Sequence, residues 1–202
     1  MGDPNIAYLA LGDSYTIGEG VAQIESWPVQ LAGKLRSSGV EIDDPVIIAK
    51  TGWTTGELLR EIKEATPPAT FGLVSLLIGV NNQYRGLSVE EYRKEFIELL
   101  NLSISFASGD KDRVFVLSIP DWSPTPFAAD RDKDRIVKEI DLFNEVNRFE
   151  TREYGIGYFD VTAISRQFSA DPSMLAEDGL HPSGLMYALW VGFVFSFVRD
   201  LL

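Results

Sequence analysis

Residues 6–15 read IAYLALGDSY, an apolar run that passes directly into the turn Gly12-Asp-Ser-Tyr15. A short, continuous apolar run bounded by turn residues is typical of a β-strand that is covered on both faces. We therefore predict a strand over Ile6–Leu11, followed by a turn into a helix. In a parallel sheet, the residues that directly follow a strand lie at the edge where ligands bind.

The same arrangement recurs along the rest of the chain. Four further apolar runs are predicted to be strands: Pro45–Ala49, Leu73–Ile78, Val114–Ile119 and Gly157–Asp160. Helical patterns lie between them, and the capping boxes Thr54-Thr-Gly-Glu57 and Ser88-Val-Glu-Glu91 indicate two helix starts. This alternation predicts a single α/β domain over residues 1–202. Its expected fold is doubly wound and flavodoxin-like, with a five-stranded, mostly parallel sheet flanked by helices.

The length and composition of the chain limit the classes of function. A chain of 202 residues suits one domain with a sizeable core. Asp and Glu outnumber Lys and Arg by 30 to 18, and the net charge of −12 argues against nucleic acid or an anionic membrane surface as partner. The sequence contains no cysteine, which excludes disulfides, thiolate catalysis and Cys-ligated metals. We expect a small-molecule substrate that is neutral or weakly charged.

Two segments bear on the location of the protein. The N-terminus shows neither the basic region nor the cleavage site of a signal peptide, so a complete chain is expected to be cytoplasmic and a processed one periplasmic or secreted. Leu185–Val198 is strongly apolar, but its 14 residues fall short of the roughly 20 that cross a bilayer. We predict a buried core helix and no stable membrane insertion, with a membrane-touching or oligomer face as the alternative. The oligomeric state stays open.

Three predicted strand ends carry groups that ester hydrolysis needs: Gly12-Asp-Ser-Tyr15, Lys50-Thr-Gly-Trp53 and Gly79-Val-Asn-Asn82. They bring a hydroxyl, a glycine N–H and a carboxamide to one edge of the sheet. The single histidine, His181, is the candidate base, and Asp178 lies close enough to bond one of its ring nitrogens. Each segment taken alone also suits an ordinary turn.

Together these blocks resemble the SGNH, or GDSL-type, esterases and lipases, and the resemblance covers the chain nearly end to end. It implies that Ser14 is the nucleophile of a triad completed by Asp178 and His181. It also implies an oxyanion hole made by the backbone N–H groups of Ser14 and Gly52 and by the side-chain amide of Asn81.

One residue departs from the family pattern. The family's Gly-x-Asn-Asp block ends here in Asn82, so a carboxamide replaces a carboxylate and the support around the oxyanion donor is expected to change. Two loops, 82–86 and 120–127, are expected to line the mouth of the site. The residues assigned to substrate binding are Trp53, Asn82, Tyr84, Arg85, Trp122 and Phe127. The aromatic rings would form an apolar wall, and Arg85 would meet a carboxylate.

The resemblance implies a carboxylic ester hydrolase that works through an acyl-enzyme, without a cofactor or metal. Its substrates would be short acyl esters, lysophospholipids, thioesters or acetylated sugars. The alternative is a catalytically weak carbohydrate- or lipid-binding module on the same fold. A single histidine disfavours a two-metal phosphoesterase, and the lack of a complete glycine fingerprint disfavours a nucleotide site.

Overall fold

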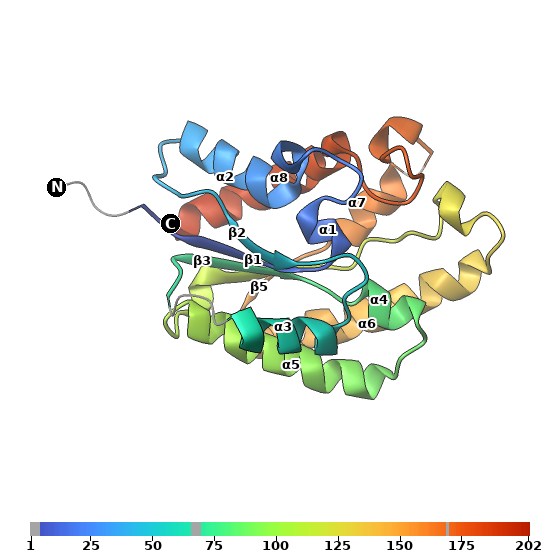
Figure 1. The fold of residues 1–202 in the computed structure, drawn as a ribbon, viewed down its shortest axis with the longest axis horizontal. Helices are drawn as coiled ribbons and strands as arrows, with labels where there is room; N and C mark the ends of the chain where they lie inside the picture. The colour runs from blue at the N-terminus through green and yellow to red at the C-terminus, as the bar shows by residue number, and fades with distance from the viewer. Residues whose placement is uncertain (1–4, 66–69, 169) are drawn as a thin grey trace.

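Five parallel strands form the centre of the computed structural model, which describes residues 5–65, 70–168 and 170–202 (Figure 1). The strands are β1 (Tyr8–Gly12), β2 (Val46–Ala49), β3 (Leu73–Leu77), β4 (Val114–Leu117) and β5 (Gly157–Phe159). Their spatial order is β2-β1-β3-β4-β5, which confirms the predicted doubly wound fold. Ile6 lies outside β1 and makes only an isolated bridge to Ile42, so the first strand begins later than predicted.

Helices cover both faces of the sheet (Figure 1). On one face lie α1 (Ser14–Ile17), α2 (Trp27–Ser37), α7 (Val161–Gln167) and α8 (Gly184–Leu201). On the other face lie α3 (Thr55–Ala65), α4 (Val80–Tyr84), α5 (Val89–Phe106) and α6 (Lys133–Glu153). Short 3₁₀ turns occupy Gln23–Glu25, Lys111–Arg113, Pro126–Ala128 and Pro172–Met174. Because of this double cover, every residue of β1, β3 and β4 is buried.

The predicted helix starts follow from local hydrogen bonding. Thr54 and Glu57 form a reciprocal capping box, in which Glu57 Oε2 accepts from Thr54 N at 2.9 Å and Thr54 Oγ1 accepts from Glu57 N at 3.3 Å. At α5, Ser88 Oγ accepts from Glu91 N at 3.3 Å, but the Ser88 hydroxyl donates to Glu90. The second box is therefore only half formed.

The apolar C-terminal segment forms α8, which has two different faces. Met186, Tyr187, Trp190, Val191, Val194 and Val198 are buried in the core. The outward face exposes Leu185, Phe193 and Phe197. By length and composition alone α8 could cross a membrane, yet a third of its apolar window is buried inside the domain. One face of α8 therefore packs in the core, as predicted for this segment, and the other face exposes apolar side chains.

The strand order decides where a site can form. β1 pairs with β2 on one side and with β3 on the other. The connection after β1 leads to one side of the sheet and the connection after β2 leads back to the other, so the strand order reverses between β1 and β3. The carboxyl ends of these two strands lead directly into α1 and α4. In open α/β sheets ligands bind at such a switch point.

Candidate active site

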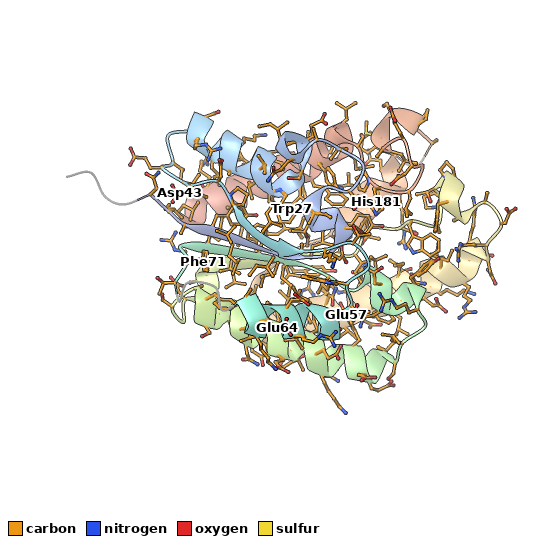
Figure 2. All side chains as sticks on the ribbon, viewed as in Figure 1. Trp27, Asp43, Glu57, Glu64, Phe71 and His181 are labelled. Atoms are coloured by element: carbon orange, nitrogen blue, oxygen red, sulfur yellow. The ribbon has the colours of Figure 1, made fainter. Side chains whose placement is uncertain are left out.

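A cavity of about 200 Å³ opens at the carboxyl edge of the sheet. Its walls come from the segments that follow β1, β2, β3 and β4 and from the loop before α8. The lining residues are Ser14, Tyr15, Thr51, Gly52, Val80, Asn81, Tyr84, Trp122, Phe127, Leu180 and His181. Figure 2 shows His181 at this end of the molecule, whereas Asp43 and Phe71 mark the opposite end of the sheet.

Ser14 is the first residue of α1, directly after β1. The turn that carries it requires glycine before it, because a Cβ at Gly12 would lie 2.1 Å from Thr16 Oγ1 and 2.4 Å from Leu77 O. Asp13 caps the helix, and its Oδ1 accepts from Tyr15 N at 3.1 Å. Ser14 is thus held on a tightly packed turn that lines the cavity.

Asp13 itself is completely buried, and its Oδ2 has no hydrogen-bond partner among the described residues. Burial raises the pKa of Asp13 to about 7, and the hydrogen bond from the Tyr15 backbone only partly opposes this. The native protein therefore keeps a proton on Asp13 over a pH range in which the unfolded chain has lost it.

This proton should make the stability of the protein fall as the pH rises from about 4 to about 7. In that window the native state binds more protons than the unfolded state, so the free energy of unfolding decreases with pH and levels off above it. In the wild-type protein the free energy of unfolding should decrease by on the order of 3 kcal/mol over this range, and Asp13→Asn should abolish that decrease. Urea unfolding at pH 4.5 and pH 8 measures it. Asp130→Asn, at an exposed position, is the control, and an Asp13→Asn protein that keeps the wild-type pH dependence would contradict the assignment.

His181 lies in the cavity wall with one side of its ring held by Asp178. Asp178 Oδ2 is 2.6 Å from His181 Nδ1, and its Oδ1 accepts from the backbone N–H groups of Leu180 and His181 at 2.9 and 3.0 Å. Partial burial acts to raise the pKa of Asp178, but these hydrogen bonds outweigh it and hold the pKa below its usual range. Tyr15 packs edge-on against the imidazole, with ring centroids 5.7 Å apart. The imidazole is thus fixed from two directions.

Two further groups line the cavity beside Ser14. Gly52 has a φ of 84°, a left-handed conformation that suits glycine, and a Cβ there would approach only Arg85. Asn81 Nδ2 donates to Trp53 O at 2.9 Å, which fixes the plane of the amide and leaves its second N–H available. A cavity that gathers a hydroxyl, a carboxylate-bound imidazole and a free amide has the groups that acyl transfer uses.

Residues 10–189 match the sequence model of the GDSL-like lipase/acylhydrolase family. The chain belongs to this family. Its membership supports ester hydrolysis as the general activity. No curated protein is similar enough in sequence to count as a match.

Solved structures, among them members of the G-D-S-L family and an SGNH-hydrolase family esterase, share the fold over nearly the whole chain. TesA is 21% identical with a TM-score of 0.74, covering 97% of this chain and 99% of its own. The psychrotrophic esterase EstA from Pseudoalteromonas sp. is 17% identical with a TM-score of 0.70, covering 97% and 98%. AlinE4, an SGNH-hydrolase family esterase, is 22% identical with a TM-score of 0.68, covering 100% and 98%.

The departure from the GDSL family pattern at Asn82 has a structural reason. Asn82 is buried, its Oδ1 accepts from Thr55 N at 3.0 Å, and its Nδ2 donates to Thr55 Oγ1 at 2.7 Å. The Thr55 hydroxyl in turn donates to Glu95. A carboxylate at position 82 could not donate to Thr55 and would add a negative charge near Glu95. The Asn82 amide joins α4 to the start of α3. The prediction that Asn82 binds substrate is wrong, because this residue does not line the cavity.

Two other residues predicted to meet substrate also lie outside the cavity wall. Arg85 pairs with Glu57 at 3.2 Å and donates to Gly52 O, so its guanidinium is engaged by the protein. Trp53 contributes its carbonyl to Asn81, and its side chain packs partly buried against the core. The other three predicted aromatic residues, Tyr84, Trp122 and Phe127, do line the cavity.

The GDSL-type motifs did not reveal every residue of the wall. Tyr15, Thr51 and Val80 are direct sequence neighbours of motif residues, which was an available signal. Arg131 does not line the cavity itself and has no such signal, although its guanidinium lies over three rings that do, those of Tyr84, Trp122 and Phe127. Among the described residues, no group of three or more His, Asp or Glu side chains is arranged to hold a metal ion.

Proposed function

We propose that this protein hydrolyses short acyl esters through an acyl-enzyme on Ser14, with His181 as general base and Asp178 orienting its ring. One observation carries the proposal: a carboxylate-held imidazole and a serine hydroxyl at a helix start line the same small cavity. The Asp178 carboxylate favours the His181 tautomer with its proton on Nδ1, which leaves Nε2 free to accept a proton.

The reaction would follow from these positions in two halves. Ser14 Oγ attacks the ester carbonyl carbon while its proton passes to His181 Nε2. The N–H groups of Ser14, Gly52 and Asn81 stabilise the negative charge on the carbonyl oxygen. The intermediate then expels the alcohol, which takes the proton from His181. In the second half, His181 removes a proton from water, the hydroxide attacks the acyl-enzyme, and Ser14 regains its proton as the carboxylic acid leaves.

Three features support a short, uncharged acyl group. The cavity of about 200 Å³ is smaller than the roughly 300–1,000 Å³ of sites for drug-sized ligands. Its outer wall is built from the rings of Tyr84, Trp122 and Phe127. The net charge of −12 disfavours anionic substrates. The esterase EstA, which shares this fold, has a structure inhibited by monoethylphosphonate, whose tetrahedral phosphorus resembles the proposed intermediate.

The test is hydrolysis of p-nitrophenyl butyrate by the wild-type protein and by Asn81→Ala. We expect Asn81→Ala to lower kcat by roughly 10²- to 10³-fold with a much smaller effect on KM, because the lost hydrogen bond acts in the transition state. Steady-state kinetics on the folded variant measure both constants. Absence of any esterase activity in the wild-type protein would leave the binding module as the better interpretation.

Asn82→Ala is the matched control for this prediction. It should cost about 1–3 kcal/mol of stability, because it leaves the buried Thr55 backbone N–H without its acceptor, while kcat falls less than tenfold. If Asn82→Ala removed activity and Asn81→Ala did not, the oxyanion donor would have been assigned to the wrong residue of the pair.

A further inference from the structure

We propose that Tyr84, held in place by Arg131, is a partition that limits the length of the acyl chain in the cavity. The kinetic test of this inference rests on the ester hydrolysis proposed above, and a binding test does not. The argument begins with two hollows that share a wall. The active-site cavity and an outer groove of about 400 Å³ are both lined by Tyr84 and Trp122. These two rings therefore separate the hollows.

The two rings of the wall are not equally fixed. Trp122 is only 3% exposed, and its Nε1 donates to Gln83 Oε1 at 2.9 Å. Tyr84 is 47% exposed and ends the short helix α4. It touches Trp122 edge-on, with ring centroids 5.7 Å apart, and Phe127 at a tilt, with centroids 6.4 Å apart. Tyr84 is thus the part of the wall that can be removed at little cost to the core.

Arg131 holds Tyr84 in this position. Its Nη2 donates to Tyr84 Oη at 3.0 Å, and its guanidinium carbon lies 5.0 Å from the centres of the Tyr84 and Phe127 rings and 5.5 Å from that of Trp122. Within the part of the chain that the structure describes, Arg131 forms no ion pair. Its contacts are therefore with the aromatic wall, as in a cation–π clamp.

The direction of the acyl chain follows from the reacting groups. The leaving oxygen must face His181, which protonates it, and the carbonyl oxygen must face Gly52 and Asn81. We place the alkyl chain along the aromatic wall, the side of the cavity lined by Tyr84, Trp122 and Phe127. Tyr84 lies three residues after Asn81 on α4, so its side chain projects from the same side of that helix. In this placement, a chain that fills the cavity ends against the Tyr84 ring, and a longer one needs the space of the outer groove.

The kinetic test compares kcat/KM for p-nitrophenyl octanoate with that for p-nitrophenyl butyrate. The wild-type protein should prefer butyrate, and Tyr84→Ala should raise the octanoate-to-butyrate ratio about tenfold. Tyr84→Phe keeps the ring and should stay within about threefold of the wild-type ratio. Arg131→Met removes the clamp and should raise the ratio by less than Tyr84→Ala does. If Tyr84→Ala does not fold, Tyr84→Leu is measured in its place, because it also shortens the wall.

A second measurement separates this inference from the proposed function. Butanoate and octanoate, the expected products, are titrated calorimetrically into Ser14→Ala and into Ser14→Ala/Tyr84→Ala. The loss of Tyr84 should raise the affinity for octanoate relative to butanoate about tenfold. Absence of all ester hydrolysis would refute the proposed function, and this binding ratio would still decide the partition. An unchanged ratio in folded Tyr84→Ala proteins would overturn the partition even if Ser14-dependent hydrolysis stands.

Discussion

Ser14→Ala is expected to lower kcat for p-nitrophenyl butyrate by roughly 10⁴- to 10⁶-fold. The substitution removes the only atom that forms the acyl-enzyme in the proposed mechanism, whereas the N–H groups of Ser14, Gly52 and Asn81 remain. Residual activity should therefore come from the oxyanion donors and from substrate binding. The fold should be unaffected, because the Asp13 cap and the turn at Gly12 do not involve the Ser14 hydroxyl.

Covalent labelling gives an independent measurement of the same prediction. A fluorophosphonate probe should add one phosphonyl group to the wild-type protein, seen as a single mass increase, and none to Ser14→Ala. Ser123→Ala is the control, because Ser123 is also a buried serine yet does not line the cavity. It should keep kcat within about threefold and should still be labelled. A Ser14→Ala protein with near wild-type turnover would refute the assignment of the nucleophile.

Asp178→Asn should lower kcat by about 10⁴-fold, the size of effect seen when a triad carboxylate is replaced by an amide. The new carboxamide can donate to His181 Nδ1 and so favours the tautomer with its proton on Nε2, which cannot accept the proton of Ser14. The fold should persist, because the remaining oxygen can still accept from the backbone N–H groups of Leu180 and His181. Equal turnover of Asp178→Asn and wild type would contradict the triad.

The same pair predicts how activity depends on pH. The proposed general base must be neutral to accept a proton, so kcat/KM should rise with pH along a single limb. Hydrogen bonds hold the pKa of Asp178 below its usual range, so its carboxylate stays ionised throughout this limb. The contribution of Asp178 to stability is lost only as the pH falls through that lowered pKa. The chain has one histidine, so an NMR titration of its ring protons is unambiguous. Its midpoint should match the kinetic one.

Two variants test whether the limb belongs to His181. Burial raises the pKa of Asp13 to about 7, so Asp13 is the competing source of the ascending limb. Asp13→Asn should retain the ascending limb, and His181→Gln should lose nearly all activity. A limb that disappears in Asp13→Asn, or an active His181→Gln protein, would assign the base to another group.

The sequence alone predicted the five strands, their doubly wound order and the segments that end at the site. These features depend on local patterns: apolar runs bounded by turn residues, and capping residues at the helix starts. The strand ends were less accurate, because pairing with neighbouring strands decides them. Ile6, predicted to begin the first strand, makes only an isolated bridge to Ile42.

The motif residues were predictable because each lies next to a strand end, and right-handed crossovers bring parallel strand ends to one edge. Side-chain partners were not predictable, because they come from elements far apart in the sequence. Asn82 and Arg85 were predicted to lie at the mouth of the cavity. They do not line it, because Asn82 binds Thr55 and Arg85 pairs with Glu57. Likewise, Arg131 reaches Tyr84 across 47 positions of sequence. Only the tertiary structure decides which polar group finds which partner, since a hydrogen bond or ion pair forms only where the packed elements bring donor and acceptor within about 3 Å.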